Sequence, residues 1–172
     1  MQKAQVIYHH MIKLKITILQ IGKTNQKEIA ELEQFYTKKI KNFVEVRTIS
    51  LKEISHGKIS SEAEKEIIKQ KEAEIILNAI PKNNYVYALS EKGQQYESKE
   101  FAYLLANNAE KNGPEITFII GGCFGLHLSI LKRANTSLSL SRMTFTHELA
   151  RPILLEQLYR ACTIIAGREY HY

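Results

Sequence analysis

Apolar residues recur along the chain at two spacings, every second residue in some segments and every third or fourth in others. The first spacing is typical of strands and the second of helices, because side chains alternate across a strand and repeat after about 3.6 residues in a helix. The pattern predicts strands over residues 14–21, 44–49, 85–89, 115–120 and 137–141. It predicts helices over residues 26–41, 61–80, 98–112 and 128–132, and a long C-terminal helix that ends near Ala166.

Polar residues and a proline indicate where three of these helices begin. Thr24 or Asn25 is expected to cap the first helix, and Ser61 with Glu64 has the spacing of a capping box for the second. Pro152 has no backbone N–H to donate. We therefore expect the regular part of the last helix to start near Pro152, or the helix to kink there.

Strands that alternate with helices predict an α/β fold, in which helices flank both faces of a mostly parallel sheet. A length of 172 residues suits a single domain. Ligands of such sheets bind beyond the carboxyl ends of the strands, where loops and helix N-termini converge. We therefore expect a site formed by the loops after Leu89, Ile120 and Leu140.

Composition narrows the class of protein. A hydrophobic fraction of 44% and a charged fraction of 24% are typical of globular chains and exclude a disordered or collagen-like protein. The apolar runs are only a few residues long, whereas a bilayer requires about 20, so we expect no membrane association. Cys123 and Cys162 lie far apart and predict free thiols. No secretory signal is recognisable, and the cytoplasm is the expected location.

The acidic residues are unusual because all 18 are Glu and Asp does not occur. This excludes the usual forms of calcium loops, of Asp-based magnesium sites and of Ser-His-Asp triads. The sequence also lacks closely spaced metal ligands of the zinc-site type. We therefore expect chemistry that needs no metal ion.

Basic residues gather at both ends of the chain. Residues 1–41 hold eight Lys against three Glu, and residues 132–172 hold six basic against three acidic residues. Five of the six arginines lie in the last 40 residues, at Arg133, Arg142, Arg151, Arg160 and Arg168. Because the guanidinium group matches phosphate oxygens, this distribution favours a polyanionic partner such as nucleic acid. A solvated basic surface is the alternative.

A glycine-rich turn, residues 121–125, follows the predicted central strand. Glycine permits positive φ and close approach of the backbone to a ligand, as a nucleoside or phosphate pocket requires, but a tight strand-to-helix turn would use glycine equally. The spacing matches neither the dinucleotide motif nor the P-loop. Cys123 and His127 could form a thiolate–imidazole pair, although a small loop residue is the favoured interpretation of Cys123.

Two later segments could bind a ligand or transfer a proton. Residues 139–147 combine hydroxyls, one Arg and three apolar side chains ahead of a helix, and could hold an adenosine. Thr144 or Thr146 could also be the N-cap of that helix. The tail, residues 167–172, places aromatic residues and His171 beside Arg168, a combination that could stack on a base, although chain ends usually fray.

An ordered set of motifs runs from the central strand to the tail. These motifs are Ile119-Ile120-Gly121-Gly122, Gly125-Leu126, Leu138-Ser139-Leu140-Ser141, Met143-Thr144-Phe145, His147, Arg151, Glu156-Gln157-Leu158-Tyr159-Arg160-Ala161 and Tyr170-His171. Together they resemble the RlmH family of SPOUT methyltransferases. The likeness covers residues 14–172 as one domain and leaves residues 1–13 outside it as an N-terminal extension.

The resemblance implies a fold and a reaction. The fold would be an α/β sheet whose C-terminal segment threads into a trefoil knot, an exception to the rule that chains are not knotted, and the protein would be a homodimer. The reaction would be methylation of N3 of a pseudouridine in 23S rRNA of the large subunit, on assembled ribosomes. The methyl donor would be S-adenosylmethionine, and no metal would be required.

The resemblance also assigns functional residues. The methyl-donor pocket would be lined by Leu89, Gly121, Leu140, Ser141, Arg142, Met143, Thr144 and Phe145. Tyr170 and His171 match the family's tail, which reaches toward the target base across the dimer. Two positions depart from the family's pattern, because Tyr172 replaces a basic residue and Thr146 replaces a common Pro.

A cationic methyl donor needs no metal activation, so we expect direct transfer that depends on the alignment of the methyl carbon and the attacking nitrogen. N3 of pseudouridine is mostly protonated at neutral pH, and His171 is the candidate base or proton relay. A non-catalytic RNA-binding α/β-knot module is the alternative function. A nucleotide-binding α/β domain, which would prefer phosphorylated ligands, is a third.

Overall fold

The computed structural model describes residues 14–168. Its strands are β1 (Lys15–Ile21), β2 (Glu45–Leu51), β3 (Tyr85–Gln94), β4 (Glu115–Ile120) and β5 (Thr136–Leu138). Its helices are α2 (Lys27–Ile40), α3 (Glu62–Ala79), α4 (Ser98–Asn112), α5 (Leu128–Arg133) and α6 (His147–Ile165). Every predicted strand and helix is present, although β5 was expected to continue to Ser141 and ends at Leu138. Two predictions lie outside the described residues. One is the extension 1–13 with its boundary to the domain, and the other is the pair Tyr170 and His171.

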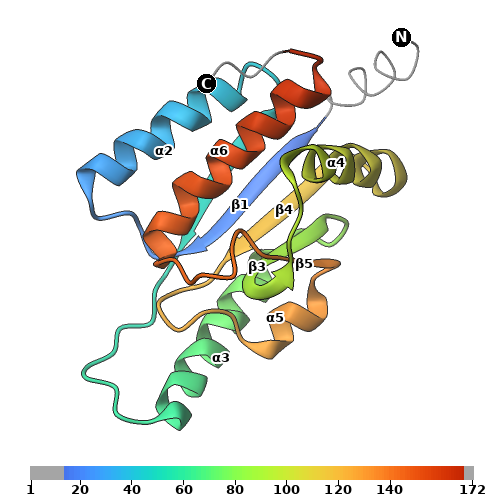
Figure 1. The fold of residues 1–172 in the computed structure, drawn as a ribbon. Helices are drawn as coiled ribbons and strands as arrows, with labels where there is room; N and C mark the ends of the chain where they lie inside the picture. Colours follow the sequence, from blue (N-terminus) through green and yellow to red (C-terminus); the bar gives the residue numbers. More distant parts are fainter. Residues whose placement is uncertain (1–13, 169–172) are drawn as a thin grey trace.

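The five strands form one parallel sheet in the order β2-β1-β4-β3-β5. Helices α2, α4 and α6 cover one face, and α3 and α5 cover the other (Figure 1). This arrangement confirms the predicted α/β fold, while the trefoil knot stays a prediction. No helix between residues 14 and 168 is long and apolar enough to span a bilayer.

The central strands are buried on both faces, which explains their nearly continuous apolar sequences. Successive residues point to opposite sides of the sheet. Ile18 and Phe118 pack with α2, α4 and α6 in the larger core cluster. Their neighbours Leu19 and Ile119 pack with α3 and α5 in the smaller one. The two faces therefore share one rigid layer, whose strand ends position the loops.

Strand β3 continues five residues beyond the predicted end at Leu89. Residues 90–94 are polar, so their hydropathy gave no strand signal. They pair with β5 nonetheless: the register shifts between Leu89 and Gln94, and the N–H of Ser139 donates to the carbonyl of Gln94 at 2.9 Å. A Cβ atom on Gly93 would lie 2.7 Å from the carbonyl carbons of Ser137 and Leu138, so this close crossing requires glycine.

Helix α6 begins at His147, five residues ahead of Pro152, so the expectation that its regular part starts near the proline is wrong. Thr146 is the N-cap, and its hydroxyl accepts a hydrogen bond from an N–H of the first turn at 3.3 Å. Glu148 in that turn also accepts from the backbone N–H of Asn25 at 3.1 Å. These bonds hold the first turn in place despite the backbone bond that Pro152 cannot make.

Candidate functional site

A cavity of about 770 Å³ lies at the carboxyl edge of the sheet, between residues 89–92 of β3, the loops that follow β4 and β5, and the first turns of α3. Small-molecule sites measure roughly 300–1,000 Å³. Seven of the eight residues that the resemblance assigns to the donor pocket line this cavity, namely Leu89, Gly121, Leu140, Ser141, Met143, Thr144 and Phe145. Arg142 belongs to the same loop but does not line the cavity. The structure thus brings the three expected segments together, although the segment after Leu89 is a continuation of β3 and not a loop.

The glycine turn after β4 places main chain rather than side chain at the cavity wall. A Cβ atom on Gly121 would lie 2.8 Å from the carbonyl carbon of Gly125, too close for non-bonded atoms. Gly125 itself has a φ of +79°, and its N–H donates to the carbonyl of Gly122 at 3.0 Å. The turn therefore requires glycine at these positions, and the space beside it stays free of side chains.

The loop between β5 and α6 is held by its own hydroxyl groups. Ser139 Oγ donates to the carbonyl of Ser141 at 2.8 Å, and the N–H of Met143 donates to Ser141 Oγ at 3.0 Å. Thr146 then caps α6, which confirms one of the two predicted caps. Met143 is 76% exposed, so an apolar side chain is left uncovered where the loop borders the cavity.

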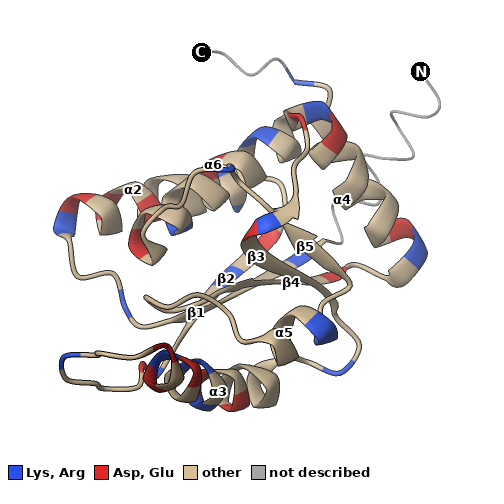
Figure 2. Ribbon diagram, turned by 60° about the horizontal axis from the view of Figure 1, so that its bottom comes forward, with Lys and Arg blue, Asp and Glu red and all other residues tan. Residues whose placement is uncertain are grey.

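The rim that α3 contributes carries charges of both signs, interspersed along the helix (Figure 2). Lys65 Nζ lies 2.5 Å from Glu62 Oε1, and Lys69 pairs with Glu66. The helix begins with the predicted capping box of Ser61 and Glu64. This rim could receive a ligand that carries both an ammonium and a carboxylate group.

A buried cation fills the neighbouring part of the same edge, between the end of β1 and α6. Arg151 is 1% exposed; its Nη2 donates to the carbonyl of Ile21 at 2.5 Å and its Nη1 to Thr24 Oγ1 at 2.9 Å. Thr24 Oγ1 in turn donates to Glu33 Oε1 at 2.6 Å. Burial lowers the pKa of Arg151 and raises the pKa of Glu33, and the attraction between their opposite charges partly offsets both shifts.

This buried cluster corrects two expectations. Thr24 or Asn25 was expected to cap α2. The N-cap is instead Gln26, whose side chain makes no capping hydrogen bond. The hydroxyl of Thr24 accepts a hydrogen bond from Arg151. The phosphate-binding interpretation of the C-terminal arginines is wrong for Arg151, whose guanidinium is buried against backbone carbonyls. Arg160 also forms an ion pair within α6.

Cys123 and His127 do not form a thiolate–imidazole pair. His127 instead caps α5, with Nδ1 accepting from the N–H of Ser129 at 3.1 Å, and its Nε2 lies 3.4 Å from Glu66. Cys123 Sγ lies 3.5 Å from Nε2 of another histidine, His56. Burial, with the nearby charges of acidic residues, raises the pKa of the Cys123 thiol, which is unfavourable for a nucleophile.

The described chain ends at the edge of the sheet opposite the cavity. The guanidinium of Arg168 lies 5.1 Å from the ring centroid of Phe43, which shortly precedes β2. Helix α6 thus starts beside the cavity with Thr146 and finishes near the amino ends of the strands. The predicted catalytic residues Tyr170 and His171 lie beyond the described residues, and their roles stay predictions.

Residues 14–171 match the family model described as "Predicted SPOUT methyltransferase". The matched range starts at the residue where the likeness in the sequence begins. The chain is also similar to two proteins named "Ribosomal RNA large subunit methyltransferase H". The one from Clostridium beijerinckii is 40% identical and the one from Clostridium acetobutylicum is 36% identical, each over 92% of this chain and 99% of the relative.

A solved structure, of a "Probable Methyltransferase" from Bordetella pertussis Tohama I, is similar in fold. The TM-score is 0.50, the sequence identity is 10%, and the match covers 92% of this chain and 99% of the other. At this identity the likeness concerns the fold alone.

Proposed function

The chain belongs to the SPOUT methyltransferase family, and from this premise we propose that it methylates N3 of a pseudouridine in 23S rRNA on assembled ribosomes, with S-adenosylmethionine as methyl donor. The observation that carries the proposal is the cavity at the carboxyl edge, which gathers seven of the eight expected donor residues from β3 and from the loops after β4 and β5. The relatives' printed name supports large-subunit rRNA as the substrate. The place of action is then the cytoplasm.

The cavity wall suits the donor's adenosine and methionine parts. Leu89 and Leu140 provide apolar surface, and the glycine turn at Gly121 allows a base or ribose to approach the backbone closely. The mixed charges on α3, including Lys65 and Glu62, complement a zwitterionic amino acid. When bound, the donor supplies a methyl group on a sulfonium, so the residues of this chain have to orient it and exclude water from it.

The acceptor nitrogen must lose a proton before or during attack, and we assign this proton transfer to His171. An imidazole has an ordinary pKa near 6.5 and therefore accepts a proton at neutral pH. Tyr170 would stack on or orient the target base. Catalysis by one positioned base is typically worth about 10²–10⁴-fold in rate.

The position of Arg168, the last described residue, supports a homodimer in which each tail serves the partner's cavity. Helix α6 has 19 residues and is about 28 Å long at roughly 1.5 Å per residue. The four residues from Arg168 to His171 reach at most about 14 Å. A tail that starts at the far end of α6 is therefore too short to return to its own cavity.

Transfer of a tritiated methyl group to intact ribosomes and to free 23S rRNA tests the proposal. We expect incorporation with ribosomes, at N3 of a pseudouridine when the nucleosides are analysed by mass spectrometry, and little incorporation with free rRNA. Donor binding without incorporation into either RNA would contradict the substrate. A chain that binds RNA but gives no heat with the donor would instead be the non-catalytic RNA-binding module.

His171→Ala tests the proton transfer in the same assay. We expect turnover to fall by about 10²–10⁴-fold, with the dissociation constant of the donor unchanged. His9→Ala, in the extension, is the matched control and should retain full turnover. Unchanged turnover in His171→Ala would remove this residue from the mechanism.

A further inference from the structure

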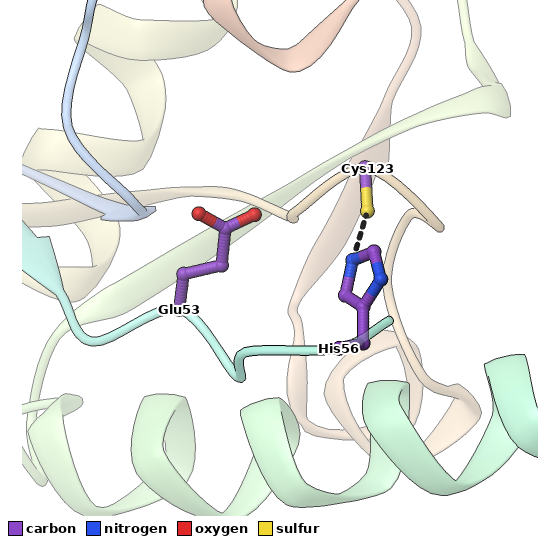
Figure 3. A group of neighbouring side chains, drawn as sticks. All are labelled: Glu53, His56 and Cys123. Carbon is purple, nitrogen blue, oxygen red and sulfur yellow. Dashed lines mark hydrogen bonds between the residues drawn. The ribbon is translucent and has the colours of Figure 1, made fainter. Parts of the chain in front are cut away.

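Three potential metal ligands meet beside the donor cavity, although they are far apart in the sequence. Glu53 and His56 belong to the loop between β2 and α3, and Cys123 belongs to the glycine turn after β4. One donor atom from each side chain lies within 4.8 Å of the other two. Figure 3 shows the thiol of Cys123 and the imidazole of His56 directed at each other, with the Glu53 carboxylate reaching up toward the glycine turn.

The sulfur and nitrogen atoms already have the spacing of two ligands on one tetrahedral zinc ion. Cys123 Sγ and His56 Nε2 are 3.5 Å apart. Zinc bonds of about 2.3 Å to sulfur and about 2.0–2.1 Å to nitrogen, at a tetrahedral angle, place the two ligand atoms about 3.5 Å apart. The Glu53 carboxylate is exposed on the same loop as His56, and one of its oxygen atoms lies within 4.8 Å of both of these atoms.

A buried carboxylate holds the two loops in this arrangement. Glu72 on α3 is 3% exposed, and its Oε1 accepts from the backbone N–H of Ile54 at 3.5 Å. A Cβ atom added to Gly122 would lie 2.8 Å from Glu72 Oε2, so the glycine turn packs directly against this carboxylate. The rings of His56 and Phe124 also pack with their centroids 5.0 Å apart. The ligands are thus presented by two packed loops, beside a second acidic group that favours a cation.

We propose that Glu53, His56 and Cys123 bind a thiophilic divalent cation of the zinc class, with water as the fourth ligand. On binding, the Cys123 thiol gives its proton to solvent and its sulfur forms the metal bond. The site connects the loop before α3 to the glycine turn that borders the donor cavity. Cys123 itself lines the donor cavity, so the site adjoins the proposed reaction centre. We assign the metal no part in methyl transfer, and the site does not depend on the proposed function.

Cobalt(II) and zinc titrations of the full-length chain test this site. The parent chain for all measurements carries His9→Ala, His10→Ala and His171→Ala, so that histidines outside the described residues provide no ligands. Cobalt bound to a thiolate gives a charge-transfer absorption in the near ultraviolet, which is displaced when zinc is added. The thiol of Cys162 is buried in the core, so this absorption reports on Cys123.

We expect the parent chain to show the absorption with one cobalt ion per chain. Cys123→Ser should abolish it, and His56→Ala and Glu53→Gln should each weaken zinc binding by about 10-fold to 100-fold. His127→Ala is the matched control and should leave the affinity unchanged, because its ring contacts Glu66 and Ser129 instead. All three ligand side chains are exposed, so the variants should fold, and their melting temperatures without metal verify this.

Two results would overturn the proposal. One is the absence of the charge-transfer absorption in the parent chain at saturating cobalt, which would leave only a thiol–imidazole hydrogen bond. The other is a zinc affinity that does not change in any one of the three ligand variants. As a second readout, zinc should raise the melting temperature of the parent chain and leave that of Cys123→Ser unchanged.

Discussion

The two halves of the sheet's carboxyl edge differ in the groups that lie beyond the strand ends. Beside the end of β1, the guanidinium of Arg151 is bonded to the carbonyl of Ile21 and to Thr24, and it fills the space. Beside the ends of β3, β4 and β5, a cavity of about 770 Å³ is bordered by a glycine turn and a hydroxyl-rich loop. One half is closed by a side chain, and the other stays open.

In this sheet, the open strand ends are those whose loops bond their own polar groups. In the open half, Ser139 and Ser141 bond within their own loop, and Gly125 bonds back to Gly122. No long side chain has to enter the cavity to complete these bonds. In the closed half the strand's carbonyl depends on Arg151, so a ligand would have to displace a buried charge.

Breaking the closed half should have the largest effect. Arg151→Met leaves the Ile21 carbonyl and the Glu33 carboxylate without their cation, and we expect a loss of about 3–5 kcal/mol in the free energy of unfolding. Unfolding in urea measures this loss of free energy. Arg142→Met is the control, because Arg142 is exposed, and should change stability by less than about 0.5 kcal/mol. Equal losses in both variants would contradict the closed-half description.

Filling the open half should weaken ligand binding as well as the fold. In Gly121→Ala the added methyl meets Gly125 at 2.8 Å, and the turn must move at a cost of about 1–3 kcal/mol. We expect S-adenosylmethionine to bind roughly 10-fold to 100-fold more weakly in calorimetry. Gly57→Ala, where the added methyl meets nothing within 4 Å, is the matched control. Unaltered donor affinity in Gly121→Ala would exclude the turn from the site.

The cap of α6 touches both halves, because Thr146 lines the cavity and the helix it starts carries Arg151. Thr146→Ala removes the hydroxyl that accepts the first-turn N–H, and we expect a loss of about 1 kcal/mol in stability. Thr146→Ser keeps the hydroxyl and should lose little. If the two variants unfold at the same urea concentration, the cap contributes nothing.

The smallest expected effect concerns Glu33, the acidic partner in the closed half. Its pKa is raised above 4.5, first by burial, so the carboxylate is disfavoured in the folded state at neutral pH. Glu33→Gln should be slightly stabilising at pH 7, and this advantage should vanish as the pH falls through the raised pKa and the wild-type carboxyl gains its proton. Glu31→Gln, on the exposed side of α2, should show no such change. If the stabilisation by Glu33→Gln increased as the pH falls, this would contradict the upward shift of the Glu33 pKa.

Periodicity was sufficient to predict the fold, because each core strand and helix buries a regular set of apolar residues. It failed for residues 90–94. These residues pair with β5 through backbone groups, and the close approach is possible because Gly93 has no side chain. It failed also at the start of α6, where Thr146 and Glu148 fix the first turn through hydrogen bonds that apolar spacing does not reveal.

The convergence of three loops was predictable from the parallel strand order, but the residues that fill the edge were not. One signal for the burial of Arg151 was present, since it stands on the same helical stripe as Leu154, Leu155 and Leu158. The contact between His56 and Cys123 had no local signal, because 67 positions separate them. Their loops are joined by tertiary packing, on Glu72 and between His56 and Phe124.

A crystal structure of the chain with S-adenosylhomocysteine tests the central claim most directly. The ligand should lie in the open half, with its adenosine against the glycine turn at Gly121 and the loop from Leu140 to Phe145, and the Arg151 cluster should be unchanged. A ligand bound elsewhere, or one that reaches this edge only by displacing Arg151, would contradict the account.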